Sequence, residues 1–297
     1  MEPDLREPTV WSVSKSIVGR LAPKYGEREA QAMMKIIFEN LKGWSTVDLA
    51  IKANEPMSAF MQGKVDGVVQ RLLDDEPIQY IFGVADFYGM KFHVNSATLI
   101  PRPETAELVD WIVNENQRKD LRVLDLGTGT GCIAVALARN LPFPDVTAVD
   151  VSGAALDVAR KNAAGLSAKI TFVEADMLQL ADSGRRGKLS PQLSGQFDII
   201  VSNPPYIAEK EKGAMAANVL EHEPASALFV PDSNPLLFYR AVVDFAGEAL
   251  AEGGAIYFEI NPDYVRELSD LCAASGFGDV TVRRDSFGKE RFMRVAR

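Results

Sequence analysis

Cysteine and histidine are scarce in this sequence. Cys132 and Cys272 are the only cysteines, and His93 and His222 are the only histidines. Their spacing matches neither a disulfide framework nor a metal-binding motif. We therefore expect reduced thiols and no metal site.

Long apolar runs and an excess of positive charge are also missing. No stretch reaches the roughly 18–20 apolar residues that span a bilayer. The acidic start of the chain, residues 1–4, lacks the pattern of a signal peptide, so we expect a cytoplasmic protein with no membrane association. The net charge of −9 argues against a broad surface that follows nucleic-acid phosphates, although a small basic patch stays open.

The first part of the chain has the apolar spacing of helices. Apolar residues recur three and four apart through residues 30–41 and 60–73. This spacing predicts an N-terminal domain of four or five helices over residues 1–76. Short β-like stretches on either side of a Tyr-Gly pair then predict a hairpin linker over residues 77–102.

Within a predicted domain of residues 103–297, strand and helix patterns alternate from about residue 120 onward. This alternation predicts a doubly wound α/β domain, with helices on both faces of a mostly parallel sheet. A stretch rich in Gly, Ser and Arg at residues 183–195 predicts a surface loop. The expected strands cover residues 121–126, 146–149, 170–173, 197–201, 255–260, 280–282 and 291–295. The expected helices include residues 131–139, 154–163 and 236–250.

A glycine-rich loop, Asp-Leu-Gly-Thr-Gly-Thr-Gly at residues 125–131, follows the first of these strands. Glycine at every second position lets a ligand approach the backbone closely. Cys132 stands where a dinucleotide fingerprint has its third glycine. Asp125 places negative charge beside the ligand, which disfavours a pyrophosphate and favours a cationic ligand that carries an amino group. The loop therefore predicts S-adenosylmethionine rather than NAD.

Acidic residues follow the next two strands. Asp150 suits ribose hydroxyls. Asp176 suits the adenine amino group, and Met177 can pack on the adenine ring. The residues that we expect at the cofactor are Asp125, Gly127, Thr128, Gly129, Thr130, Gly131, Asp150, Asp176 and Met177.

The sequence Asn-Pro-Pro-Tyr at residues 203–206 follows a fourth apolar strand. The prolines have a fixed φ and no N–H group, which holds the carbonyls there in place. The side-chain oxygen of Asn203 and the carbonyl of Pro204 can accept both hydrogens of a planar –NH2 group. Pro205 and the ring of Tyr206 can pack against it. We therefore take Asn203, Pro204 and Tyr206 as the catalytic residues.

With these motifs the chain resembles class I methyltransferases of the Asn-Pro-Pro-Tyr type and, more closely, the peptide chain release factor glutamine methyltransferases. The similarity rests on the glycine loop, on residues 201–207 and on three further segments. These are Glu-Pro-Ile-Gln-Tyr-Ile-Phe-Gly at 76–83, Thr-Leu-Ile-Pro-Arg-Pro-Glu-Thr at 98–105 with Glu-Leu-Val at 107–109, and Glu-His-Glu-Pro-Ala-Ser-Ala-Leu at 221–228.

The resemblance implies a Rossmann-like sheet of seven strands with a helical N-terminal domain that helps to grip a release factor. It implies methyl transfer from S-adenosylmethionine, which becomes S-adenosylhomocysteine, to the N5 amide nitrogen of the glutamine in a Gly-Gly-Gln motif. It also implies a cofactor contact at Asn203 and substrate contacts at Asn203, Pro204, Pro205 and Tyr206. Two alternatives stay open, a nucleic-acid adenine-N6 methyltransferase and a non-catalytic module that binds S-adenosylmethionine.

Three charged residues near these motifs allow two roles each. Arg102 can reach the substrate or anchor the loop before its helix. For Glu221 and Glu223 we expect a solvated helix face rather than a contact with a basic release factor surface. We expect a monomer, with no direct nucleic-acid partner.

Overall fold

The computed structural model describes residues 8–180 and 190–297, which divide into two compact units. One unit extends to Phe82 and includes Ala217–His222, and the other contains Gly83–Ala216 and Glu223–Arg297. The division therefore falls after Phe82, inside the predicted linker of residues 77–102.

The helical unit is built from amphipathic helices, and short polar residues cap the N-terminal ends of several of them. The Thr9 hydroxyl accepts from the Ser12 amide at the first helix, and Ser45 and Asp48 form a reciprocal capping box at the third. The apolar stripes meet in a single core that includes Ile17 and Phe38. The helices are α1 (Val10–Tyr25), α2 (Glu27–Lys42), α3 (Thr46–Ile51), α4 (Ala59–Leu73), α5 (Ile78–Phe82) and α10 (Ala217–His222).

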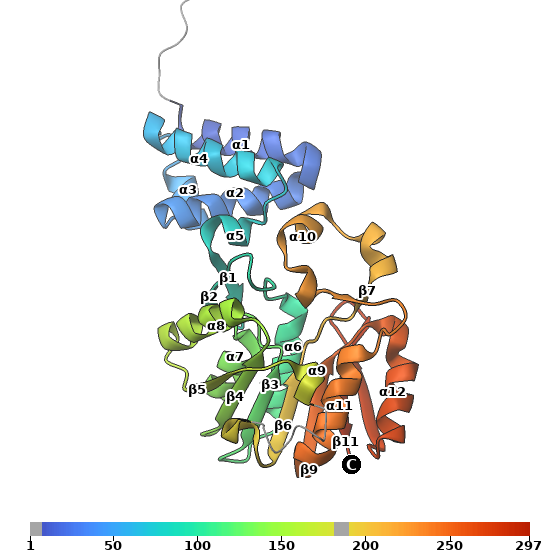
Figure 1. The fold of residues 1–297 in the computed structure, drawn as a ribbon. Coiled ribbons are helices and arrows are strands. Elements are labelled where there is room, and N and C mark those ends of the chain that lie inside the picture. The colour runs from blue at the N-terminus through green and yellow to red at the C-terminus, as the bar shows by residue number, and fades with distance from the viewer. Residues whose placement is uncertain (1–7, 181–189) are drawn as a thin grey trace, which may run out of the picture. The chain divides into compact units, whose positions relative to one another are not determined.

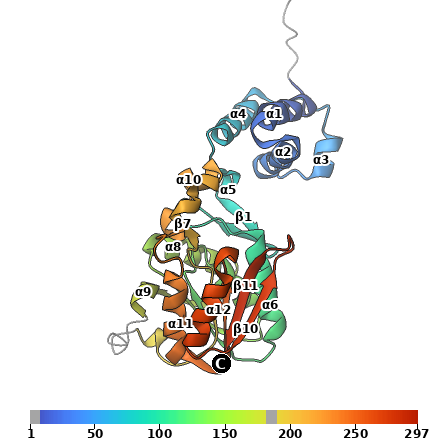
Figure 2. The same ribbon diagram turned by 90° about the vertical axis from the view of Figure 1, so that its right-hand side faces the viewer.

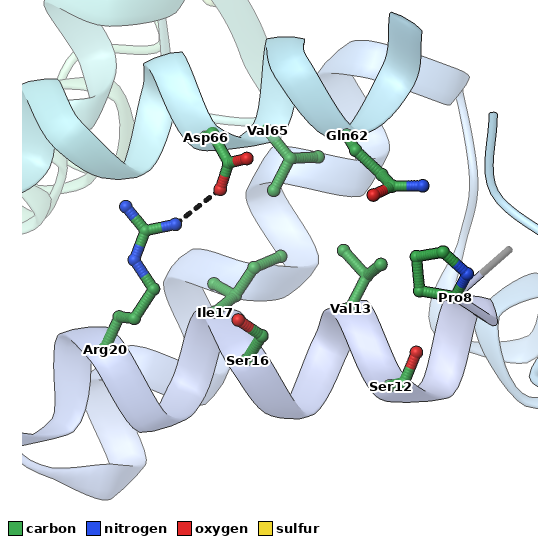
Figure 3. A pocket seen from close by; sticks show the side chains of 9 residues that line it. All are labelled: Pro8, Ser12, Val13, Ser16, Ile17, Arg20, Gln62, Val65 and Asp66. Atoms are coloured by element: carbon green, nitrogen blue, oxygen red, sulfur yellow. Dashed lines mark hydrogen bonds and ion pairs between the residues drawn. The ribbon is translucent and has the colours of Figure 1, made fainter. Parts of the chain in front are cut away.

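A pocket of about 310 Å³ lies between α1 and α4 (Figure 3). Its base is apolar, formed in part by Val13, Ile17 and Val65. Arg20 and Asp66 close one end with an ion pair in which both side chains keep solvent contact. These two charges therefore neutralise each other at the pocket mouth.

The second unit is a twisted sheet of seven strands in the order β10-β11-β9-β6-β3-β4-β5 (Figure 1). Neighbours from β9 to β5 are parallel, whereas β11 is antiparallel to both β9 and β10. The strands are β3 (Arg122–Leu126), β4 (Asp145–Asp150), β5 (Ile170–Glu174), β6 (Phe197–Ser202), β9 (Leu250–Glu259), β10 (Asp279–Arg284) and β11 (Glu290–Ala296).

Helices cover both faces of this sheet, as the sequence pattern predicts. In Figure 2, α6 lies on one side of the β10–β11 edge, and α11 and α12 lie on the other. The first face carries α6 (Pro103–Glu115), α7 (Cys132–Asn140) and α8 (Gly153–Gly165). The second carries α9 (Met177–Leu180), α11 (Leu237–Ala249) and α12 (Val265–Ala274).

Smaller elements complete the unit. The predicted hairpin is present as β1 (Val84–Phe87) and β2 (Met90–His93). Two short strands form a separate pair, and 3-10 turns connect the longer elements. These elements are β7 (Ile207–Ala208), β8 (Phe229–Val230), η2 (Pro191–Leu193), η3 (Glu209–Ala214), η4 (Ala225–Ala227) and η5 (Pro262–Tyr264).

Some elements differ from the sequence-based expectation. The helix α12 was not predicted, and β9 begins at Leu250 rather than at residue 255. Of the predicted loop at residues 183–195, positions 183–189 lie outside the described residues, and η2 buries Leu193 in the core. Among the helices of residues 8–180 and 190–297, none is long and apolar enough to cross a membrane.

Asn162 on α8 links the hairpin to the glycine loop. Its Nδ2 donates to the His93 and Thr130 carbonyls at 3.0 and 2.9 Å. Its Oδ1 accepts from the His93 amide at 2.7 Å, and the side chain is buried. The amide thus holds the end of β2 against the glycine loop through three hydrogen bonds.

We expect Asn162→Ala to lower the free energy of unfolding by about 2–4 kcal/mol, because three bonds disappear and buried backbone groups lose their partners. Urea unfolding measures the change. Asn140→Ala is the matched control, since that exposed amide bonds only the Ala136 carbonyl of its own helix. Equal losses in the two variants would contradict the proposed linking role.

Candidate active site

The Asn-Pro-Pro-Tyr motif begins where β6 ends, at the carboxyl edge of the sheet. Ser202, the last residue of β6, donates its hydroxyl to the Leu126 carbonyl at the end of β3, 2.7 Å away. This bond joins the two strand ends that carry the motif and the glycine loop. Pro204 is buried and Asn203 is half-buried, so the asparagine side chain keeps access to a ligand.

The side chain of Asn203 is held through its nitrogen. Its Nδ2 donates to the hydroxyl of Thr105 on α6, with 3.4 Å between the two atoms. Within residues 8–180 and 190–297 no hydrogen bond is made to the Asn203 Oδ1 or to the Pro204 carbonyl oxygen. Two consecutive residues therefore each offer one hydrogen-bond acceptor without a partner in the described part of the chain.

Glu259, at the end of β9, is buried and is linked to Asn203 through the Thr105 hydroxyl. Its Oε2 accepts from the Thr105 hydroxyl at 2.7 Å, and its Oε1 accepts from the Tyr206 hydroxyl at 2.9 Å. Burial raises the pKa of Glu259, against the lowering effect of these two hydroxyls and of the Arg291 charge. Burial and the neighbouring Glu259 raise the pKa of Tyr206 well above its ordinary value, which keeps that phenol neutral.

Sequence reasoning missed Glu259 as a site residue and included Thr105 only within a segment of family resemblance. A signal for Glu259 was present, because it is the only charged residue in the apolar stretch 255–260, at a strand end equivalent to that of Asp150. Its partner is 154 residues away in the sequence, and no local pattern reveals that pairing.

The glycine loop turns sharply between β3 and α7. The amides of Gly127 and Thr128 both donate to the Val149 carbonyl at 2.9 Å. Gly127 and Gly131 have φ angles of +79° and +78°, which side chains rarely tolerate. A Cβ atom on Gly131 would lie 3.1 Å from the Ala159 Cβ, so this glycine also lets α7 pack against α8.

Asp125, the last but one residue of β3, is completely buried. Its Oδ2 accepts from the Thr128 hydroxyl at 2.6 Å, while its Oδ1 has no hydrogen-bond partner in the described part of the chain. Burial raises the pKa of Asp125 to about 7, although the Thr128 hydroxyl and the nearby Ala134 amide favour the charged form. A cation placed close by would stabilise that form further.

Asp150 and Asp176 support the loops at their own strand ends. Asp150 accepts from the Gly129 amide at 2.8 Å and from the Ser152 amide at 2.9 Å. Asp176 accepts from the Leu178 amide at 2.9 Å and from the Gln179 side chain at 3.2 Å. Each carboxylate keeps further lone pairs for a ligand.

Met177 lies over the glycine loop. A Cβ atom on Gly127 would be 3.0 Å from the Met177 Cε, so the loop glycine makes room for this methyl group. The strand ends thus bring the predicted Met177 together with the loop, as the order of the parallel strands requires.

The predicted solvated position of Glu223 is wrong. Glu223 is buried, its Oε2 accepts from the Ile100 amide at 3.1 Å, and its Oε1 pairs with Arg102 at 2.5 Å. Sequence reasoning failed here because the partners lie more than a hundred positions away. Arg102 therefore anchors the segment before α6, which was one of its two predicted roles, whereas Glu221 is exposed.

The chain is similar to members of two known protein families. The PrmC N-terminal domain family matches residues 15–83, and the methyltransferase small domain family matches residues 105–230. A release factor glutamine methyltransferase of Flavobacterium psychrophilum is 42% identical over 282 residues, covering 94% of this chain and 95% of that protein. One of Bacteroides thetaiotaomicron is 44% identical over 273 residues, covering 92% and 95%.

The chain belongs to the release factor glutamine methyltransferase family. A methyltransferase structure from Pyrococcus furiosus shares the fold, with a TM-score of 0.50 and 17% identity over 76% of this chain and 95% of that one. The class I methyltransferase fold and the S-adenosylmethionine cofactor expected from the sequence are thereby confirmed. Among the described residues no cluster of three or more metal-ligating side chains occurs.

Glycine substitutions test the packing of this family's loop. Gly129→Ala and Gly131→Ala both place a side chain at positive φ, which costs about 1–2 kcal/mol. We expect Gly131→Ala to lose about 1–3 kcal/mol more, because its Cβ atom meets Ala159 whereas nothing lies within 4 Å at Gly129. Urea unfolding without cofactor measures both. A greater loss for Gly129→Ala would contradict this account.

The raised pKa of Asp125 predicts a pH effect on the enzyme without cofactor. Protonated Asp125 contributes stability that is fully present below the unfolded pKa of 3.8 and is lost as the pH rises through the folded value of about 7. Asp125→Asn removes this titration. Between pH 5 and pH 8, wild type should therefore lose about 2–3 kcal/mol relative to the variant.

Urea unfolding of both proteins at the two pH values measures that difference. The other carboxylates are common to both proteins, so their titrations cancel in the comparison. Parallel pH profiles would show that Asp125 is ionised in the folded protein throughout this range.

Proposed function

We propose that this protein transfers a methyl group from S-adenosylmethionine to the N5 side-chain nitrogen of the glutamine in the Gly-Gly-Gln motif of peptide chain release factors. The observation that carries the proposal is the pair of free acceptors at the end of β6, the Asn203 Oδ1 and the Pro204 carbonyl oxygen. A primary amide presents two N–H donors in one plane, and these acceptors suit both. The names of the similar proteins support a glutamine as the acceptor.

The residues around the glycine loop fit the cofactor. The buried Asp125 Oδ1 has no partner in the described part of the chain, which suits a ligand that carries positive charge. We assign the loop of residues 127–131 to the amino acid part of the cofactor and Asp150 to the ribose hydroxyls. Asp176 would accept from the adenine amino group, and Met177 would pack on the ring.

The chemistry requires exact placement of a weak nucleophile. S-adenosylmethionine supplies an electrophilic methyl group when it is bound. An amide nitrogen reacts poorly because its lone pair is delocalised into the carbonyl. Asn203 and Pro204 would hold the nitrogen in line and favour the charge that develops on it, and such positioning is worth about 7–11 kcal/mol in well-oriented systems. The proton becomes acidic as the bond forms and can leave to water.

Tyr206 would contribute its ring rather than its hydroxyl. The hydroxyl is engaged by Glu259, so the phenol is held in place and its face can pack on the planar amide with Pro205. A substrate contact at Arg102 stays a prediction, since that side chain already pairs with Glu223.

The two alternatives from the sequence are less well supported. A flipped adenine also presents a planar amino group, but the relatives that cover nearly the whole chain are named for a glutamine in a protein. A non-catalytic module would not require free acceptors beside the cofactor loop. Release factors are therefore the proposed partners, and a cytoplasmic, monomeric state remains a prediction.

The test uses the full chain, methyl-labelled S-adenosylmethionine and a purified release factor. We expect label in the Gly-Gly-Gln peptide and none in a release factor whose motif glutamine is changed to alanine. Total RNA is the rival substrate, and label on RNA alone would overturn the proposal.

Asn203→Ala should reduce turnover by about 10²–10³-fold, because one oriented acceptor for the transition state is lost. Cofactor affinity, measured by calorimetry, should fall much less. Near-normal turnover of this variant would show that the side-chain amide does not hold the nucleophile.

A further inference from the structure

The side chain of Asn203 has two ends of nearly equal shape and opposite hydrogen-bonding character. If its oxygen faces the substrate, it can accept an N–H bond. If the group is turned over, an NH2 group faces the NH2 group of the substrate, and two donors meet. Something must therefore select one of the two orientations.

Thr105 can make this selection because its hydroxyl has only one hydrogen. That hydrogen is directed to the Glu259 Oε2 at 2.7 Å, so the hydroxyl can only accept from Asn203. An acceptor facing the asparagine requires its NH2 group on that side. The oxygen then faces away, toward the proposed substrate position.

Glu259 sets the direction of the Thr105 hydroxyl. Each Glu259 oxygen lies within hydrogen-bond distance of one hydroxyl, that of Thr105 or that of Tyr206. These two hydroxyls and the Arg291 charge favour the ionised carboxylate against burial, and in that form Glu259 can only accept hydrogen bonds. Thr105 and Glu259 are each about 2% exposed, so water does not compete for these bonds. The direction is thus imposed from the buried end of the network.

We infer that Glu259 and Thr105 are positioning residues, which orient the Asn203 amide with its oxygen toward the acceptor nitrogen of the substrate. Neither residue touches the reacting atoms, and both act through Asn203. This inference rests on the proposed function for its kinetic consequence, but the orientation itself can be observed without any reaction.

Thr105→Val keeps the shape of the side chain and removes the hydroxyl. We expect kcat for release factor methylation to fall about 10- to 100-fold, as small misplacements at a reacting centre do, with KM changed less than about threefold. Thr105→Ser restores the hydroxyl and should recover most of the lost rate. A loss of rate in Thr105→Ser as large as that in Thr105→Val would show that the hydroxyl is not sufficient for the effect, and would overturn the inference.

Thr147→Val is the matched control, because it removes the hydroxyl of another buried threonine, which lies within strand β4 rather than beside Asn203. Its kcat should stay at the wild-type value. Glu259→Gln keeps the shape but leaves one oxygen for two hydroxyls, and should lower kcat at least about tenfold while Thr105→Val adds little to it. Full activity of Glu259→Gln would show that Glu259 does not position Asn203 and would overturn that part of the inference.

A double-variant cycle tests whether Thr105 acts through Asn203. In an Asn203→Ala background, followed by single-turnover transfer of labelled methyl, Thr105→Val should cause no further loss. The same fold-loss in both backgrounds would show an independent role and overturn the inference.

The side-chain NH2 resonance of Asn203 gives a readout that does not depend on activity. It is assigned by its disappearance in Asn203→Ala and should shift in Thr105→Val and Glu259→Gln but not in Thr147→Val. Such shifts without methylation of a release factor would overturn the proposed function alone. Methylation by wild type with no shift and no loss of rate in Thr105→Val would overturn the positioning role alone.

Discussion

The site depends on the parallel pairing of β6 with its two neighbours. Ser202 at the end of β6 lies opposite Leu126 of β3 on one side and opposite Phe258 of β9 on the other. The next residues, Asn203 and Glu259, are consequently brought to the same edge of the sheet. A slip of one residue in either pairing would turn these side chains to the opposite face. Backbone hydrogen bonds between apolar strands therefore determine the alignment of the polar groups.

Two buried acids at this edge differ in how their charge is compensated. Glu259 has a hydroxyl on each oxygen and a cationic neighbour, Arg291, so its environment is complete within the protein. Asp125 has a partner on one oxygen only within the described residues, and burial works against its ionisation. An unpaired buried carboxylate opposes folding, so the stability of the fold gives no reason for Asp125. A cationic ligand would compensate the Asp125 charge, whereas the Glu259 charge is compensated by the protein itself.

Features set by local sequence were predictable, whereas features set by distant contacts were not. The glycine loop and the buried strands follow from spacing within a few residues, and the sheet order then brings Asp150 and Met177 to one edge. Glu223 was misjudged because its burial depends on Arg102, and Glu259 was missed because it acts on Thr105. In each case a charge appears solvated until the fold supplies a partner. The helix α12 was missed for a simpler reason, since its ten residues lie between two strong strand patterns.

The motif at residues 203–206 suits any planar amino group, so the choice of a glutamine depends on parts outside it. The ion pair between the buried Glu223 and the half-buried Arg102 joins two of the segments that carry the family resemblance. Breaking such a pair leaves a buried charge, which makes the contact sensitive to geometry. Arg102 is also the N-cap of α6, and Thr105 lies in the first turn of that helix. The contact that fixes the segment around Glu223 therefore lies within one helical turn of the hydroxyl that we infer to orient Asn203.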